Sequence, residues 1–349
     1  AAGMVDHLEA AGFLCFGPSA KAAEIESSKV FSKNLMKKYN IPTAGYEVFS
    51  DPAAALEYIK AQGTYPAVIK ADGLALGKGV IIAQNEEEAK AGLHSIMEDK
   101  IFGESGSQVV VEEFLTGPEV SVLAFTDGKT MCPMVSSMDH KRAYDGDKGP
   151  NTGGMGTISP NPFYTEEVAK ECMEKIFLPT MNAMNAEGRP FKGCLYFGLM
   201  LTPQGPKVIE YNSRFGDPET QVVLPRLETD FAEIVKAVAE ERLSQVDIHW
   251  SEKASACVVM ASGGYPGSYP KGIEIQGLDE NGQVEGVTVY HAGTKWENGK
   301  FLTNGGRVLG ITALGNTLDE ALDLAYAGVE KISFEGAMYR KDIGRTHRK

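Results

Sequence analysis

Hydrophobic positions recur at helical spacing in several parts of the chain. The chain opens with a helical pattern over residues 4–11, and apolar residues between 19 and 39 recur at intervals of three and four. Further helices are predicted at 86–97, 166–186, 230–241 and 318–332. These segments have the length of ordinary globular helices.

Short apolar runs alternate with the helical segments and predict strands. A first run at 13–16, ended by the turn residues Gly17 and Pro18, suggests a short buried strand. Further strands are predicted at 66–70, 79–83, 108–112, 256–260 and 287–291, and a pair at 194–201 and 207–212 surrounds a turn. The alternation indicates α/β organisation up to about residue 243, where short β-like runs among glycine-rich turns begin. We predict a domain boundary there.

Composition and charge exclude several classes of protein. With 43% hydrophobic residues the chain can bury an ordinary core, and 34 Lys+Arg against 47 Asp+Glu give a net charge of −13. This charge repels polyanions and argues against nucleic-acid binding as the main activity. The five cysteines are scattered without a Cys-x-x-Cys pair, which fits reduced thiols. No apolar stretch approaches the roughly 20 residues of a bilayer span, and we predict a cytoplasmic protein without a membrane partner.

A strand that delivers Lys70 to a glycine loop carrying Lys78 is the first candidate site. Backbone amides around Gly77 and Gly79 can face phosphate oxygens while the two ammonium groups neutralise them. The spacing is not that of a Walker A loop, because three residues separate Gly73 from Gly77 and no Ser or Thr follows Lys78. A mobile turn with two solvated lysines is the alternative.

Two further strand ends carry acidic residues. The strand at 108–112 runs into Glu112 and Glu113, with Leu115 and Glu119 beyond, a set that could accept the amino group of adenine and hold a ribose hydroxyl. An ordinary acidic strand end is the alternative.

The second of these strand ends carries Glu210, Asn212 and Arg214 at alternate positions, so on a strand all three point to one face. Oxygen ligands beside a guanidinium suit Mg²⁺ and an anion. The turn that follows adds Asp217 and Glu219. A strand with one solvated face is the alternative.

The glycine- and proline-rich segment 139–162 is a candidate substrate loop. It contains Asp139, His140 and Lys141, followed by the run 149–156 with Asn151, Thr152 and Gly153. Basic side chains and glycine-exposed amides suit a phosphorylated or carboxylated substrate, and a disordered surface loop is the competing interpretation. For His140 we expect a positioning role, since neither a G-x-S-x-G elbow nor an H-E-x-x-H helix supports a hydrolase.

In their order, spacing and residue identities these motifs resemble the glycinamide ribonucleotide synthetase family, the phosphoribosylamine–glycine ligases of the ATP-grasp superfamily. The resemblance spans nearly the whole chain and rests on Ser28-Lys29 and on the segments 70–80, 112–115, 139–142, 149–156, 210–221, 265–267, 291–294, 305–309 and 339–344. It implies an α/β and α+β ATP-grasp fold. The expected parts are the remnant of an N-terminal α/β domain at 1–18, an ATP-grasp domain at 19–243 with a lid at about 41–115, and a small C-terminal α+β domain at 244–349.

The resemblance also implies a reaction. ATP would phosphorylate the carboxylate of glycine, and the amine of 5-phosphoribosylamine would attack the acyl phosphate, giving glycinamide ribonucleotide, ADP and phosphate in purine biosynthesis. Mg²⁺ or Mn²⁺ is the implied metal, and the chain could belong to a longer multifunctional purine-synthesis protein. Another ATP-grasp carboxylate–amine ligase, or a truncated fragment that binds ATP without full catalysis, is the alternative.

The resemblance assigns roles residue by residue. Its ATP-binding set is Lys29, Lys70, Gly77, Lys78, Gly79, Glu112, Glu113, Leu115 and Glu119. Its metal ligands are Glu210 and Asn212, and its catalytic residues are Arg214 and Lys141. Its substrate-binding set is Asp139, Asn151, Thr152, Gly153, Asp217 and Glu219. One departure is Ser213, which stands where the family usually has Cys.

Overall fold

The chain forms two compact units, each assembled from segments that are distant in sequence. The computed structural model describes residues 2–74 and 79–345. Unit 1 comprises Ala1–Pro133, Thr165–Arg214 and Ala232–Val246; unit 2 comprises Met134–Tyr164, Phe215–Phe231 and Asp247–Lys349. The chain passes between the two units several times. This division therefore does not test the predicted continuous domain ranges, which stay predictions.

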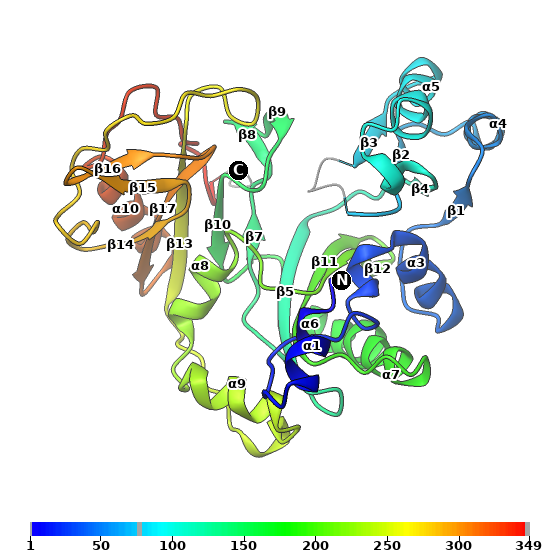
Figure 1. Cartoon of the computed structure of the whole chain (residues 1–349), viewed down its shortest axis with the longest axis horizontal. Helices are drawn as coiled ribbons and strands as arrows, with labels where there is room; N and C mark the ends of the chain where they lie inside the picture. Colours follow the sequence, from blue (N-terminus) through cyan, green and yellow to red (C-terminus); the bar gives the residue numbers. More distant parts are fainter. Residues whose placement is uncertain (1, 75–78, 346–349) are drawn as a thin grey trace. The chain divides into compact units, whose positions relative to one another are not determined.

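The first sheet of unit 1 has four antiparallel strands in the order β1-β4-β2-β3. The strands are β1 (Tyr46–Phe49), β2 (Ala67–Ala71), β3 (Val80–Ala83) and β4 (Val109–Glu113). Two helices, α4 (Pro52–Gln62) and α5 (Glu86–Leu93), cover one face of this sheet (Figure 1) and share a buried apolar cluster with it. Asp51 and Asn85 cap these helices by accepting hydrogen bonds from backbone N–H groups of the first turn.

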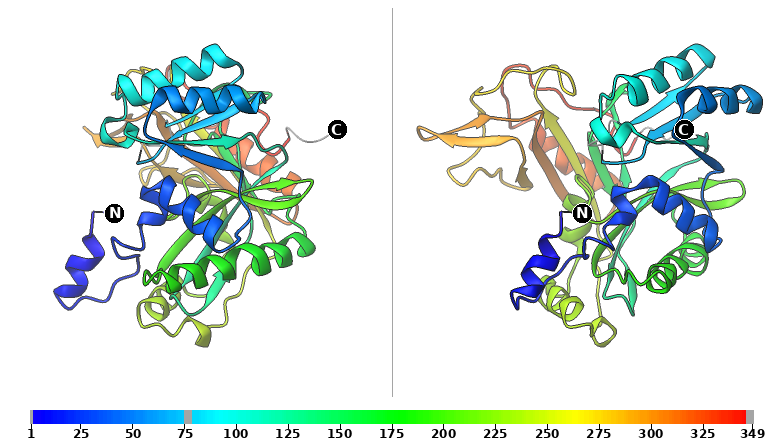
Figure 2. Two further views of the ribbon diagram at one scale, coloured as in Figure 1. Left: turned by 90° about the vertical axis from the view of Figure 1, so that its right-hand side faces the viewer. Right: turned by 45° about the vertical axis from the view of Figure 1, so that its right-hand side comes forward.

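The second sheet of unit 1 has the order β12-β11-β5-β6. Its strands are β5 (Glu119–Thr126), β6 (Met131–Pro133), β11 (Gly193–Thr202) and β12 (Gly205–Asn212). The other helices of this part of the chain are α1 (Met4–Ala10), α2 (Glu24–Ser27), α3 (Lys29–Lys38), α6 (Glu166–Cys172), α7 (Leu178–Ala186) and α9 (Phe231–Ala239), seen from two further sides in Figure 2. A single π-helical turn, Met173–Phe177, joins α6 to α7, so the predicted helix at 166–186 is confirmed.

A segment before β1 connects the two sheets of unit 1. Thr43 forms a parallel bridge with Val208 on β12, and its Oγ1 donates to the Val208 carbonyl at 2.7 Å. The register of β11 and β12 also shifts here, because Gly198 pairs with Glu210 and Leu199 with Val208. Ile209 therefore has no register partner on β11, as in a β-bulge.

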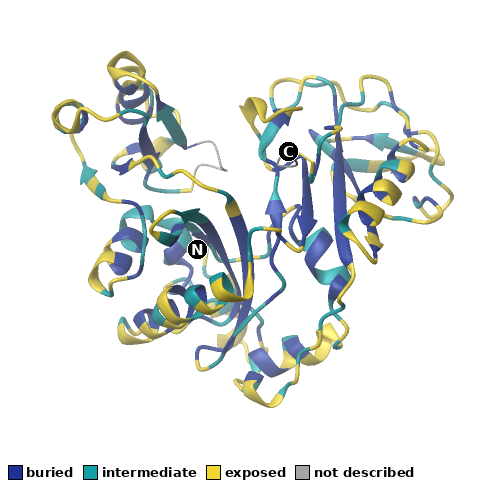
Figure 3. Cartoon of the chain, turned by 180° about the vertical axis from the view of Figure 1, so that it is seen from behind, coloured by how far each residue is buried: buried dark blue, intermediate teal, exposed yellow. Residues whose placement is uncertain are grey.

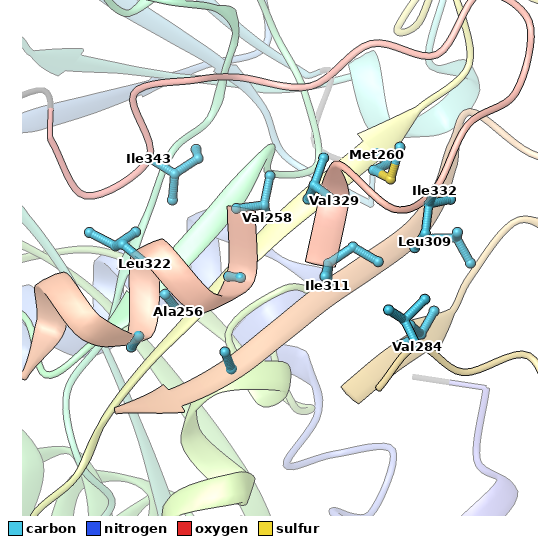
Figure 4. Close-up of a cluster of buried hydrophobic side chains, with 14 of the residues drawn as sticks. Ala256, Val258, Met260, Val284, Leu309, Ile311, Leu322, Val329, Ile332 and Ile343 are labelled. Carbon is cyan, nitrogen blue, oxygen red and sulfur yellow. The ribbon is translucent and has the colours of Figure 1, made fainter. Parts of the chain in front are cut away.

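Unit 2 is built on a five-stranded sheet in the order β14-β17-β13-β10-β7. Its strands are β7 (Met138–Asp139), β10 (Gly156–Ser159), β13 (Ala254–Ala261), β14 (Thr288–His291) and β17 (Arg307–Gly315), and separate pairs are formed by β8 (Arg142–Tyr144) with β9 (Lys148–Asn151) and β15 (Thr294–Glu297) with β16 (Lys300–Thr303). Helix α10 (Leu318–Val329) packs against β13 and β17, so that Leu322 and Val329 join the same buried cluster as Val258 and Ile311 (Figure 4). The unit also contains α8 (Thr220–Val223).

One predicted strand is wrong. Central strands such as β2, β13 and β17 are mostly buried, edge strands such as β3 and β14 are less so, and many exposed residues lie on helices and loops (Figure 3). Residues 13–16 form no strand, and Phe13 and Leu14 are 62% and 70% exposed. No strand among the described residues pairs with this segment, so its backbone has no ladder to join.

Two smaller corrections concern helix and loop patterns. The helical pattern at 19–39 contains two helices, since Ser28 is extended and its side chain caps α3 by accepting from the Phe31 N–H. The segment 139–162, which carries little hydrophobic periodicity, contains the short strands β7 to β10. Of the helices that the structure describes, none combines the length and apolar composition required to cross a bilayer.

The turn between β4 and β5 requires glycine at position 117. Gly117 has φ +145°, and a Cβ there would collide with the carbonyl oxygen of Leu201. We expect Gly117→Ala to lower the free energy of unfolding by at least about 2 kcal/mol in denaturant titrations. Gly12→Ala is the control, because Gly12 also has a positive φ but no atom lies within 4 Å of its added Cβ; its loss should be about 1 kcal/mol. Equal losses would contradict the steric argument.

Candidate functional site

A buried carboxylate shared by two lysines marks the candidate nucleotide site of unit 1. The Oε2 atom of Glu112 lies 3.0 Å from Lys70 Nζ and 3.2 Å from Lys33 Nζ, and all three side chains are at most 7% exposed. The Oε1 atom of Glu112 is also buried, and it has no hydrogen-bond partner among the described residues. A buried charge needs a partner, and the two lysines supply one to Oε2.

Lys33 is a partner of Glu112 that the sequence analysis missed. Its ammonium group also donates to Thr43 Oγ1 at 2.8 Å and to the Ala44 carbonyl at 3.4 Å. Burial lowers the pKa of Lys33 to about 8, although the charge of Glu112 acts in the opposite direction. Lys33 comes from the first turns of α3, where the capping Ser28 starts the helix.

Lys70 and Lys29, both predicted phosphate ligands, hold backbone carbonyls in this structure. Lys70 Nζ donates to the carbonyl of the bulged residue Ile209 at 3.2 Å, and Lys29 Nζ donates to the Gly73 carbonyl at 3.1 Å. Burial lowers the pKa of Lys29, and the nearby charge of Glu210 opposes this shift. Lys29, Lys70 and Glu210 are thus close enough to affect one another.

The end of β2 fixes the start of α3. The Asp72 carboxylate accepts from Ser28 Oγ at 3.0 Å and from the Val30 N–H at 2.8 Å. Gly79 lies at the far side of the glycine loop, where its carbonyl accepts from the Ala71 N–H at 2.8 Å. Gly77 and Lys78 lie outside the described residues.

The remaining residues of the predicted adenine and ribose set differ in their surroundings. Glu113 follows Glu112 on β4 and therefore points to the opposite face. Its Oε1 accepts from the Gly45 N–H at 3.0 Å and from Lys207 Nζ at 2.9 Å, and the Gly45 hydrogen bond lowers the pKa of Glu113. Leu115 is half-buried just after β4, and Glu119 is exposed at the first position of β5.

The predicted metal ligands lie at the end of β12. Glu210 and Asn212 are half-buried and occupy alternate positions of the strand, so they share one face. Arg214 does not continue this face, because β12 ends at Asn212; the expectation of three residues on one strand face is wrong for Arg214. The backbone bends at Ser213 and Arg214. There the Glu26 carboxylate accepts from the Ser213 N–H at 2.7 Å and lies 3.7 Å from Arg214 Nε.

The glycine-rich loop of unit 2 is held by its own polar groups. Thr152 donates from both its N–H and its Oγ1 to the Lys141 carbonyl, each at 2.8 Å, and its Oγ1 accepts from the Gly154 N–H at 3.0 Å. Asn151, the last residue of β9, pairs with Arg142 of β8. The loop is therefore ordered, contrary to the disordered alternative.

Arg307 brings two predicted substrate residues together, and sequence reasoning gave it no role. Its Nη1 donates to the carbonyls of Gly153 at 2.9 Å and Asp217 at 2.8 Å, and its Nη2 lies 3.0 Å from Asp217 Oδ2. Asp139, another predicted substrate residue, lies close to the same loop, since a Cβ added to Gly154 would be 2.6 Å from Asp139 Oδ1. Glu219 is 4% exposed in the turn that follows Asp217. Arg307 belongs to the segment 305–309 on which the family resemblance rests. Its contacts with Gly153 and Asp217 could not be predicted from any sequence spacing.

The C-terminal segment clamps the same loop through Arg340, which is fully buried. Its guanidinium lies 2.8 Å from Asp147 Oδ1 and from Asp342 Oδ1, and it donates to the Arg142 carbonyl at 3.1 Å. His140 joins this contact: the Gly344 N–H donates to its Nε2 at 3.0 Å, so its Nδ1 is the donor to the Gly156 carbonyl at 3.1 Å. Both ring nitrogens are hydrogen-bonded within the chain, which fits a structural role; the positioning role expected from the sequence stays a prediction.

Comparison with known proteins gives the family. The model of the phosphoribosylglycinamide synthetase ATP-grasp (A) domain matches residues 27–220, and that of the phosphoribosylglycinamide synthetase C domain matches residues 255–346. The chain belongs to the phosphoribosylglycinamide synthetase family. The predicted family and ATP-grasp fold are therefore confirmed.

Individual relatives cover almost the whole chain. A phosphoribosylamine–glycine ligase of Caldanaerobacter subterraneus is 52% identical over 98% of this chain and 81% of its own length. The trifunctional purine biosynthetic protein adenosine-3 of Gallus gallus is 52% identical over 99% of this chain, which spans 34% of that protein. The crystal structure of a phosphoribosylamine–glycine ligase from Thermotoga maritima superposes with a TM-score of 0.84 at 38% identity, covering 94% of this chain and 81% of that one.

Glu210 and Asn212 are the candidate metal ligands of this synthetase-family chain. Among residues 2–74 and 79–345, no group of three or more His, Cys, Asp or Glu residues gathers in a form that could hold an ion. Glu210 and Asn212 offer one carboxylate and one amide oxygen on the same strand face. Mg²⁺ commonly takes one or two protein carboxylates and completes its shell with phosphate and water, so these residues fit a nucleotide-bound magnesium ion.

His140 makes stability depend on pH. Burial, with Arg340 as a second cause, lowers the pKa of His140 to about 4 from an ordinary value of 6.5. The unfolded chain therefore takes up a proton below pH 6.5 that the folded chain does not, and stability falls as the pH drops from about 6.5 towards 4. We expect this histidine to remove about 3 kcal/mol over that window.

His140→Gln keeps a donor and an acceptor and removes the titration. Denaturant titrations at several pH values should show a flatter acid dependence for His140→Gln than for the wild type. His249→Gln is the control, because the His249 side chain is 66% exposed beside Asp247, and its pH dependence should match the wild type. An unchanged slope in His140→Gln would contradict the assignment.

Arg340→Met should destabilise unit 2. The substitution leaves Asp147 and Asp342 without their buried cation, and we expect a loss of about 3 kcal/mol in the free energy of unfolding. Arg345→Met is the matched control in the same segment, since Arg345 is exposed and pairs with Asp323 on the surface; its loss should stay within about 1 kcal/mol. Similar losses for both variants would contradict the clamp.

Proposed function

We propose that this chain ligates glycine to 5-phosphoribosylamine at the expense of ATP, giving glycinamide ribonucleotide, ADP and phosphate. The reaction class follows from membership of the phosphoribosylglycinamide synthetase family. The observation that carries the proposal on this chain is the close grouping of Lys29, Lys70, Glu112 and Glu210 in unit 1. Two lysines, one buried and one half-buried, beside carboxylate oxygens suit a nucleoside triphosphate and its metal.

The nucleotide is bound by residues of unit 1. Lys29 and Lys70 neutralise phosphate oxygens, exchanging their carbonyl partners for stronger charge-assisted contacts. Glu112 accepts from the amino group of adenine, Leu115 packs beside the base, and Glu119 holds a ribose hydroxyl. The burial of Lys70 and Glu112 supports these roles, because interactions between charges are stronger where water is excluded. The glycine loop would contact the phosphates through Gly77, Lys78 and Gly79. Glu113 would support the neighbouring Glu112 through its contacts with Gly45 and Lys207.

The first step is phosphoryl transfer from ATP to the glycine carboxylate. Glu210 and Asn212 would hold Mg²⁺ (or Mn²⁺), which when bound neutralises charge on the phosphates. Arg214 is exposed beyond β12, where its guanidinium can bind the carboxylate of glycine or the transferring phosphoryl group. Transfer of this kind depends mainly on alignment and charge neutralisation, so the chain needs no nucleophile of its own.

The second step joins glycine to the amine. The nitrogen of 5-phosphoribosylamine attacks the carbonyl carbon of glycyl phosphate, the C–N bond forms, the amine loses a proton and inorganic phosphate leaves. The residues of unit 2 that would bind the amine substrate are Asp139, Lys141, Asn151, Thr152, Gly153, Asp217 and Glu219. Their support is the ordered loop and the Arg307 contacts to Gly153 and Asp217. We propose a cytoplasmic site for the reaction.

Glycine-dependent ADP release tests this function. With freshly generated phosphoribosylamine, Mg²⁺ and ATP, the wild type should release ADP only when both substrates are present. Glu210→Gln should lower the rate about 100-fold or more, since it removes the charge that holds the metal. Glu233→Gln is the control, because Glu233 is exposed on α9. ADP release that does not need glycine, or that prefers another amino acid, would overturn the substrate assignment.

A further inference from the structure

Lys33 is a buried lysine whose donors are all engaged within the protein. An ammonium group has three donors, and those of Lys33 are directed to Glu112 Oε2, Thr43 Oγ1 and the Ala44 carbonyl. The Tyr46 ring lies on a further side, 5.5 Å from Nζ to the ring centroid. Lys33 therefore has no donor left to bind a ligand directly, and any effect on a ligand must pass through Glu112.

The carboxylate of Glu112 is held in one orientation. Its Oε2 receives two ammonium groups, whereas its buried Oε1 has no hydrogen-bond partner in the part of the chain that the structure describes. A buried acceptor without a donor is destabilising, and a ligand N–H that reaches it removes the penalty. A ligand oxygen at the same place would add repulsion, because an ionised carboxylate can only accept.

Lys33 and Lys70 both bind Glu112, but they differ in their other partners. Lys70 is shared between Glu112 and the Ile209 carbonyl, and under the proposed function it also turns to phosphate. Lys33 remains with Glu112 in either case. Without it the carboxylate could rotate, and Oε1 would no longer be held in one direction.

We propose that Lys33 is a positioning residue that makes the nucleotide site select 6-amino purines over 6-oxo purines, by holding the Glu112 side chain with only Oε1 towards the base. Adenine carries an amino donor at position 6, whereas hypoxanthine and guanine carry an oxygen acceptor there. A site built around one buried acceptor rejects the wrong group more strongly than an apolar pocket does. The inference rests on the proposed function, in which ATP binds to unit 1 with the amino group of adenine at Glu112.

The test compares ATP with inosine triphosphate, which carries an oxygen at purine position 6 in place of the amino group. Calorimetric titration of the 349-residue chain should give a dissociation constant about 10- to 100-fold larger for inosine triphosphate, the range expected for a hydrogen bond to a charged group. In Lys33→Met the affinity for ATP should fall about tenfold while that for inosine triphosphate changes little, so the ratio of the two constants also falls about tenfold.

Lys37→Met is the matched control. Lys37 is on the same helix, its Nζ lies 5.6 Å from the same Tyr46 ring, and its side chain is exposed. Thr43→Val is a milder second variant, because it removes one acceptor of Lys33 and conserves volume. We expect Lys37→Met to leave the ratio unchanged and Thr43→Val to lower it about threefold.

Each result decides between selectivity and plain structural support. A loss of affinity by the same factor for both nucleotides, in Lys33→Met or in Thr43→Val, would overturn the inference, as would an unchanged ratio. A wild type that binds ATP and turns over, but does not discriminate against inosine triphosphate, would overturn the inference alone. A wild type that binds no ATP would overturn both the inference and the proposed function.

Discussion

One buried negative charge organises the nucleotide half of this molecule. Glu112 draws Lys70 from β2 and Lys33 from α3 to a single oxygen, and Lys70 in turn reaches the carbonyl of Ile209 at the bulge of β12. Removing one partner of a buried pair leaves an uncompensated charge, which typically costs about 3–5 kcal/mol. Both sheets of unit 1 are therefore tied to one point, and Lys70, a proposed phosphate ligand, is held there by contacts within the chain.

In unit 2, arginines hold the glycine-rich loop in the way that lysines hold Glu112 in unit 1. A glycine-rich loop has few apolar side chains to order it, so its carbonyls need hydrogen-bond donors from elsewhere. Arg307 supplies them to Gly153 and Asp217, and Arg340 supplies them to Asp147 and the Arg142 carbonyl. Guanidinium groups suit this task because their planar set of donors reaches several acceptors at once. Order in the loop thus depends on residues almost at the end of the chain.

Local patterns predicted most of the elements and failed where the cause was distant in sequence. Periodicity found the β11–β12 pair and helix α10, since the alternation and the amphipathic face are written in consecutive residues. It failed at 13–16, where an apolar run has no strand beside it, and at Arg214, where the contact with Glu26 follows the end of β12. The motifs located Lys70, Glu112 and Glu210, but Lys33 and Arg307 act through contacts that no spacing reveals.

The most direct test of nucleotide binding at Glu112 is a crystal structure of the chain with a non-hydrolysable ATP analogue and Mg²⁺. We expect the amino group of adenine within about 3.2 Å of Glu112 Oε1, the phosphates against Lys29 and Lys70, and the metal between the phosphates and Glu210 with Asn212. A nucleotide whose base lies away from Glu112, or whose phosphates contact neither lysine, would contradict this placement.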